Sequence, residues 1–116
     1  MTQPVYYCLD LKDDPQLIID YRKWHAAGAV PPAVVKSIRT AGIASLDIFL
    51  AGNRLVMVLV PGPAFDEAAK AAADAADPEI QAWEDLMWTF QQALPFAEPG
   101  QKWVRMEPIF SLDDQP

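Results

Sequence analysis

The chain has a single cysteine, Cys8, and a single histidine, His25. One cysteine excludes a disulfide within the chain and is typical of a reducing compartment, so a cytoplasmic location is expected. With one cysteine and one histidine, a structural zinc site would have to consist largely of carboxylates, so no metal is expected. Any reaction that needs an imidazole has one candidate residue, His25.

Basic residues and long apolar runs are also scarce. Nine Lys and Arg against sixteen Asp and Glu give a formal net charge of −7. This charge disfavours nucleic acid and anionic membranes as partners, because both select a basic surface. The longest apolar candidate, residues 55–60, is much shorter than the roughly 18 residues that a membrane span needs. The first residues show no basic segment followed by an apolar run, so no secretory signal is expected.

The residues that are abundant suit one small domain. The chain has 116 residues, of which 52% are hydrophobic, enough for a single buried core. Residues 1–116 are therefore treated as one domain. Strand, helix-start and turn signals follow one another along it. The expected elements are a strand (4–11), a helix (16–27), a short helix (31–42), two strands joined by a turn (43–51 and 54–60), two helices (65–76 and 78–94) and a final strand (102–112).

This order predicts an α+β fold of the ferredoxin-like type. A four-stranded antiparallel sheet then carries the helices on one face only. The other face holds apolar residues by alternation, including Ile43 and Phe49. An apolar sheet face without a cover usually marks an interface. We therefore expect a homodimer packed sheet to sheet, in the manner of a dimeric α/β barrel.

The most informative spacing is that of Tyr21 and His25, which are four residues apart on the first expected helix. They lie on one face of that helix, one turn apart. The ordinary interpretation is a core stripe with one satisfied histidine. The functional interpretation is an imidazole that titrates near neutral pH beside a phenol that can hydrogen-bond it or a ligand. The spacing alone does not decide between them.

Trp83, early in the last expected helix, is a third candidate. All helices are expected on the same face of the sheet, which would let Trp83 approach His25. Rings of tryptophan and tyrosine stack on the C–H faces of sugars, whereas histidine and carboxylates bind hydroxyl groups. The other interpretation is that Trp83 belongs to the core together with Met87 and Phe90.

Taken in order, the sequence resembles the L-rhamnose mutarotase family over roughly residues 5–112. The individual motifs are short, and it is their order and spacing together that carry the resemblance. The motifs are the Asp14-Pro15 helix start, Tyr21-x-x-x-His25, Pro32 with a short helix ending at Gly42, the strand 46–50, the helix carrying Trp83 and the closing strand 109–112.

The resemblance implies an isomerase that interconverts the α and β anomers of a 6-deoxy sugar, works without a cofactor and forms dimers. Carried over by position, His25 matches the catalytic histidine, Tyr21 a sugar-contacting tyrosine and Trp83 a tryptophan of the pocket. The reaction removes a proton from the anomeric hydroxyl and delivers one to the ring oxygen. One imidazole can make one of these transfers. The other transfer is left to Tyr21, to a carboxylate such as Asp47 or Glu84, or to water.

The chain also departs from the family pattern. Members have an asparagine after the histidine and a Trp-Pro-Glu entry to the second helix, where this chain has Ala26 and Pro31-Pro32-Ala33. Leu46 replaces a tyrosine of the second strand that contacts the sugar, which makes Leu46 an expected substrate-binding position. These changes cluster around the expected pocket and leave His25 intact. L-Fucose, also a 6-deoxyhexose, therefore stands beside L-rhamnose as the expected substrate.

Two other classes of function are compatible with the same residues. A non-catalytic sugar-binding or metabolite-binding module would bind without accelerating anomer exchange. An oxygenase-like or haem-handling enzyme of the dimeric α/β-barrel type shares the layout of the fold and would also use His25. A measurement of anomer exchange distinguishes a binding module from a mutarotase. An absorbance spectrum after haem titration distinguishes a haem-handling enzyme from a mutarotase.

Overall fold

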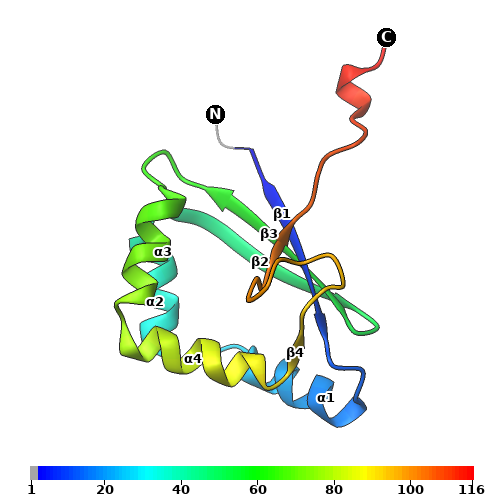
Figure 1. Cartoon of the computed structure of the whole chain (residues 1–116). Helices are drawn as coiled ribbons and strands as arrows, with labels where there is room; N and C mark the ends of the chain where they lie inside the picture. Colours follow the sequence, from blue (N-terminus) through cyan, green and yellow to red (C-terminus); the bar gives the residue numbers. More distant parts are fainter. Residues whose placement is uncertain (1–2) are drawn as a thin grey trace.

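The computed structural model describes residues 3–116. After the first strand, pairs of helices and pairs of strands follow one another along the chain, and the C-terminal segment leaves the body of the molecule (Figure 1). The elements are β1 (Val5–Leu11), α1 (Pro15–Trp24), α2 (Pro32–Thr40), β2 (Ile43–Ala51), β3 (Arg54–Pro61), α3 (Glu67–Ala75), α4 (Pro78–Trp88), β4 (Gln91–Gln92), β5 (Val104–Arg105) and a short 3-10 helix (Leu112–Asp114). No helix within residues 3–116 is long and apolar enough to span a bilayer.

The sheet is antiparallel and has the strand order β2-β3-β1-β4, with β5 also paired to β1. The tight turn at Gly52, which has a φ of 60°, joins β2 and β3 into the expected hairpin. This order confirms the predicted α+β fold. Residues 3–116 form five strands instead of the expected four, because two short strands share the edge beside β1.

The prediction of one final strand over residues 102–112 is therefore wrong. The edge is formed first by β4, directly after α4, and then by β5, with the loop 93–103 between them. The pairing of β4 with β1 also ends α4 at Trp88, six residues earlier than predicted. Beyond Met106, whose N–H donates to the Tyr6 carbonyl, the chain leaves the sheet. Pro108 has no N–H to continue the pairing.

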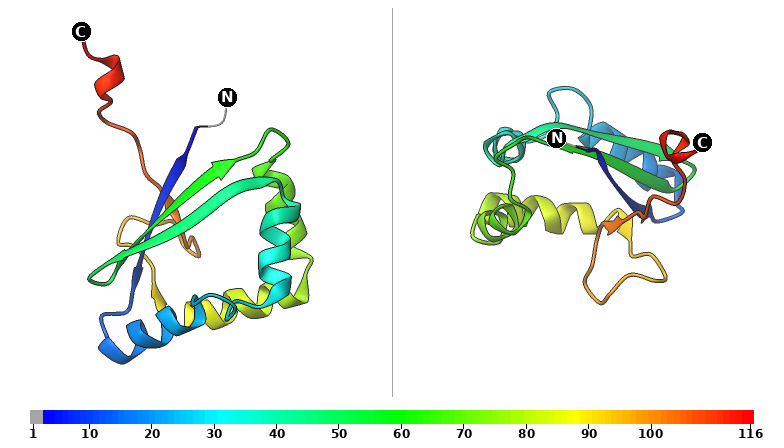
Figure 2. Two further views of the ribbon diagram at one scale, coloured as in Figure 1. Left: turned by 180° about the vertical axis from the view of Figure 1, so that it is seen from behind. Right: turned by 90° about the horizontal axis from the view of Figure 1, so that it is seen from above.

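One face of the sheet carries the core. The register places Leu9 opposite Leu55, and both are essentially inaccessible to solvent. A cluster of buried side chains joins this face to α1, α4 and the turn after α4. Its members are Leu11, Tyr21, Leu55, Met87 and Phe90. In the right-hand view of Figure 2, α4 lies beside one face of the sheet.

A bulge in β2 changes the face on which Ile43 lies. Ile43 pairs with Pro61 and Ser45 with Val60, so Ala44 is an extra residue in the strand. An extra residue reverses the alternation of side chains beyond it. Ile43 therefore faces the helices and is 8% exposed, and its prediction on the uncovered face is wrong. Phe49, after the bulge, is exposed.

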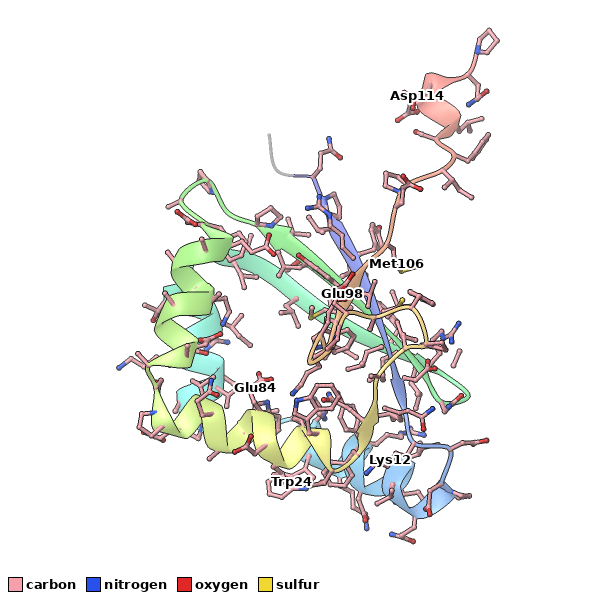
Figure 3. The ribbon with its side chains drawn as sticks, viewed as in Figure 1. Lys12, Trp24, Glu84, Glu98, Met106 and Asp114 are labelled. Carbon is pink, nitrogen blue, oxygen red and sulfur yellow. The ribbon has the colours of Figure 1, made fainter. Side chains whose placement is uncertain are left out.

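The opposite face of the sheet, which we call the open face, is covered by no helix of the described residues. Tyr6 and Phe49 are exposed there, and Arg54 holds Asp10 through two hydrogen bonds of 2.8 and 3.2 Å. The segment 107–112, which we call the C-terminal arm, extends away from the body beyond Met106 (Figures 1 and 3). Its Ile109 is 90% exposed, and Phe110 is exposed as well. The open face and the arm together present a large uncovered apolar surface.

Candidate functional site

Helix α1 positions the first two candidate residues. Its start is fixed by the Asp14 carboxylate, which accepts hydrogen bonds from the N–H groups of Gln16 and Leu17, and by Pro15 in the first turn. Tyr21 is 4% exposed and packs into the core cluster. His25 caps the C-terminal end of the helix and is only half-buried. The sequence thus anchors Tyr21 and leaves His25 at the edge of the core.

The hydrogen bond of the His25 ring defines its tautomer. Nδ1 lies 2.8 Å from the carbonyl oxygen of Tyr21. A carbonyl oxygen only accepts, so Nδ1 carries the hydrogen and Nε2 keeps a free lone pair. Burial lowers the pKa of His25 below its ordinary value, outweighing the opposite effect of this hydrogen bond. His25 is therefore neutral at neutral pH and has one nitrogen able to accept a proton.

Tyr21 is held in the protonated form. Burial, with a smaller contribution from the charge of Glu84, raises the pKa of its phenol to about 12, and a hydrogen bond from Gln91 opposes that rise. The rings of Tyr21 and His25 are 4.2 Å apart between centroids. The structure thus places a protonated phenol, which can donate, next to an imidazole, which can accept.

Trp83 lies close to His25, although it is not among the residues that line the adjacent cavity. Its ring centroid is 5.6 Å from that of His25, and it also contacts Trp24 edge to face at 6.0 Å. Figure 3 shows Trp24 at the place where α1 and α4 meet. Because α4 runs past the end of α1, the two helices bring Trp83 and His25 together from positions far apart in the sequence. The ring of Trp83 thereby closes one side of His25.

A cavity of about 430 Å³ opens beside this pair of residues. Its size falls within the range of small-molecule sites. One wall comes from α1 and the other from the β2-β3 hairpin. The lining residues are Tyr21, Arg22, His25, Ile48, Phe49, Leu50 and Leu55. Leu46 is not among them, although it lies on the same face of β2 as Ile48, two residues away. The cavity therefore combines an apolar wall with the polar groups of α1.

The two carboxylates considered for the second proton transfer are placed differently. Asp47 pairs with Val58 on the open face, away from the cavity. Glu84 lies on the side of α4 that faces the sheet (Figure 3), and its Oε2 is 2.6 Å from Nζ of Lys102. Lys102 also lies 4.9 Å from the centre of the Trp88 ring. Of the candidates for the second proton transfer, Tyr21 is therefore the one whose ring contacts the ring of His25.

Sequence reasoning missed Gln91. This residue begins β4, is 4% exposed, and its Nε2 donates to the Tyr21 hydroxyl oxygen at 3.2 Å. Its Oε1 is buried and has no hydrogen-bond partner among residues 3–116. Leaving a buried polar atom unpaired costs about 1–3 kcal/mol. No motif marks Gln91, because its burial depends on the pairing of a two-residue strand.

Arg22 was also missed. It lines the cavity beside His25, yet in the sequence it resembles any exposed base near the end of a helix. Among the described residues, no group of three His, Cys, Asp or Glu side chains is placed to hold a metal ion. The polar residues that line the cavity are Tyr21 and Arg22, which belong to α1, and His25, which caps the C-terminal end of α1.

The sequence model of the L-rhamnose mutarotase family matches residues 5–112. The chain belongs to the L-rhamnose mutarotase family. Mutarotases are isomerases that interconvert the anomers of a sugar, so the predicted family and class of enzyme are confirmed.

Two curated relatives cover most of the chain. The L-fucose mutarotase of Xanthomonas campestris pv. campestris is 54% identical over 112 residues, which are 97% of this chain and 90% of the relative. A UPF0734 protein of Dictyostelium discoideum is 31% identical over 109 residues, 90% of this chain and 86% of the relative. This member of the L-rhamnose mutarotase family is thus more than half identical to a protein named for L-fucose.

The crystal structure of an L-rhamnose mutarotase from Formosa agariphila has the same fold. Its TM-score to this chain is 0.65 at 17% sequence identity, over 95% of this chain and 98% of that chain. At this level of identity the likeness concerns the fold alone. The fold predicted from the order of strands and helices is confirmed by it.

Proposed function

We propose that this mutarotase interconverts the α and β anomers of L-fucose, with His25 as the catalytic proton acceptor. The observation that carries the proposal is the neutral imidazole whose Nε2 is free while Nδ1 is bound to the Tyr21 carbonyl, beside a cavity of about 430 Å³. The identity of 54% to an L-fucose mutarotase supports L-fucose over L-rhamnose. So do the departures from the family pattern at Ala26 and Leu46.

The reaction needs two proton transfers and no redox change. His25 Nε2 takes the proton of the anomeric hydroxyl, the bond between C1 and the ring oxygen breaks, and its electron pair stays on the ring oxygen. The Tyr21 hydroxyl donates its hydrogen to that oxygen. The open-chain aldehyde rotates about its C1–C2 bond and closes on the other face, with both transfers reversed. Acid–base catalysis of this kind contributes about 10²- to 10⁴-fold.

The cavity suits a sugar that lacks one hydroxyl group. Ile48, Leu50 and Leu55 form an apolar wall, against which the methyl group of a 6-deoxyhexose loses no hydrogen bond. Tyr21, Trp83 and Leu46 are proposed as substrate-binding residues. Tyr21 lines the cavity, Trp83 closes the far side of His25, and Leu46 continues the apolar face of β2.

The proposal is tested by measuring anomer exchange on a panel of sugars. We expect exchange NMR to show faster α–β interconversion of L-fucose than of L-rhamnose, with D-glucose at its spontaneous rate. Acceleration of L-rhamnose alone would overturn the choice of sugar. Binding of L-fucose without any acceleration would instead indicate a non-catalytic sugar-binding module.

The pH profile follows from the state of His25. Below its pKa the imidazole is protonated and cannot accept a proton, and burial places that pKa below the ordinary value of 6.5. We expect kcat/KM, corrected for the spontaneous rate, to be constant through neutral pH and to fall only below pH 6.5. The unfolded chain takes up this proton at higher pH, so the free energy of unfolding also decreases as pH falls from 6.5 through the folded pKa. An acid limb centred above pH 6.5 would contradict this assignment.

We also propose that the working unit is a homodimer that covers the open face and the C-terminal arm. Tyr6 and Phe49 on the open face and Ile109 and Phe110 on the arm are exposed apolar side chains, and a second copy of the chain would bury them. A cytoplasmic location is proposed as well, supported by the single cysteine, Cys8, which is typical of reducing compartments.

The dimer is tested with one charged substitution at each of two exposed aromatic residues. We expect the wild-type chain to elute with light-scattering mass twice 12.9 kDa, and Tyr6→Glu to shift it to the monomer. Phe96→Glu is the matched control, because Phe96 is exposed but belongs to the loop 93–103, outside the proposed interface. A monomeric wild-type chain, or a Tyr6→Glu variant that stays dimeric, would refute the proposed interface.

A further inference from the structure

Gln91 is a polar residue whose burial is not explained by a contribution to stability. It lies opposite Leu11 in the pairing of β4 with β1, and its side chain is 4% exposed. Its one side-chain hydrogen bond among the described residues joins Nε2 to the Tyr21 hydroxyl oxygen at 3.2 Å, and Oε1 is left unpaired. An apolar side chain of similar length would fill the same space without burying an unpaired oxygen.

We propose that Gln91 is a positioning residue, whose N–H holds the Tyr21 hydroxyl so that the phenolic hydrogen points into the cavity. The inference rests on the proposed function of Tyr21 as the donor to the ring oxygen. A hydroxyl group that accepts a hydrogen bond on one side cannot direct its own hydrogen to that side. Because Gln91 donates to the hydroxyl oxygen on one side, the phenolic hydrogen of Tyr21 is available for donation on the cavity side, where Tyr21 forms part of the wall.

The surroundings of Tyr21 make Gln91 the group that sets this direction. The His25 ring lies against the tyrosine ring at an angle of 32°, and its Nδ1 is bound to the backbone carbonyl of Tyr21, not to the hydroxyl. The charge of Glu84 acts on Tyr21, but its carboxylate is bound to Lys102. The remaining neighbours in the cluster are apolar. Without the amide, nothing polar in this cluster orients the hydroxyl group.

Two variants separate positioning from packing. Gln91→Met keeps the length of the side chain and removes the donor. We expect kcat for L-fucose to fall about tenfold, with KM little changed, because one neutral hydrogen bond is lost at a distance from the sugar. The melting temperature should stay or rise, since the unpaired oxygen is gone. Gln91→Glu should lower kcat further, because a carboxylate accepts the phenolic hydrogen and turns it away from the cavity.

The decisive measurement repeats Gln91→Met in a Tyr21→Phe background. If Gln91 acts through the hydroxyl of Tyr21, the second substitution should cause no further loss of kcat. An equal loss in both backgrounds, or a Gln91→Met variant with wild-type kcat, would overturn the inference.

A spectroscopic readout keeps this test independent of the proposed function. In protein labelled with carbon-13 at the tyrosine Cζ, Gln91→Met should shift the Tyr21 resonance and leave those of Tyr6 and Tyr7 unchanged. An unshifted Tyr21 resonance would show that the hydrogen bond does not exist. Absence of anomer exchange in the wild-type chain, with the shift present, would instead refute the proposed function alone.

Discussion

His25→Ala is expected to lower the catalysed rate of L-fucose anomer exchange by about 10²- to 10⁴-fold, the whole contribution of acid–base catalysis. The reason is that His25 lines the cavity and has Nε2 as its acceptor nitrogen, because the 2.8 Å bond from Nδ1 to the Tyr21 carbonyl fixes its tautomer. The measurement is exchange NMR at neutral pH, with the spontaneous rate subtracted.

The fold should survive this substitution. His25 caps the end of α1 and is only half-buried, so its side chain contributes little to the core formed around Tyr21. Lys23→Ala is the matched control, because Lys23 is an exposed residue of the last turn of the same helix. Circular dichroism should be the same for both variants. Wild-type exchange in His25→Ala would show that the base is another residue.

Tyr21→Phe is expected to lower kcat about 100-fold, the usual effect of removing one hydrogen-bond donor from the charge that develops in a transition state. The phenylalanine ring keeps the packing of Tyr21 against Leu11, Leu55 and Phe90, so the effect isolates the hydroxyl group. Because the phenol has a pKa of about 12, the wild-type group is a donor over the whole neutral range.

Stability should change in a defined direction in the same variant. Removal of the hydroxyl leaves Nε2 of Gln91 without its partner, which lowers the free energy of unfolding by about 1–3 kcal/mol. Tyr6→Phe is the control, because it removes a hydroxyl group from the exposed open face. A Tyr21→Phe variant with wild-type kcat would show that the second proton transfer is made by another group or by water. Unfolding in urea measures the stability of both variants.

The pair at the centre of the site could be predicted because its geometry is local. Tyr21 and His25 are four residues apart on a helix with a clear start at Asp14, so their proximity needs no knowledge of the rest of the fold. Trp83 needed one further step, the placing of all helices on one face of the sheet. Those three residues lie together in the structure.

Other features of the fold and the site depend on contacts that no sequence pattern predicts. The bulge at Ala44 moves Ile43 to the buried face, and alternation alone cannot locate an extra residue in a strand. The edge strands β4 and β5 have two residues each, too few for any periodicity. Gln91 acquires its role only through that pairing, and Leu46 has an apolar side chain that suits both a core and a cavity wall.

The contact between Trp24, Trp83 and His25 has a practical consequence for measuring this protein. Two indole rings lie within 6.0 Å of each other, and one of them lies 5.6 Å from the imidazole. Emission from an indole ring changes when the adjacent imidazole gains a charge or when a sugar displaces water beside it. Of the other two tryptophans, Trp88 has its ring centre 4.9 Å from Nζ of Lys102, and Trp103 packs against the core cluster. Intrinsic fluorescence is thus expected to follow the titration of His25 without a label, because Trp83 lies beside its ring.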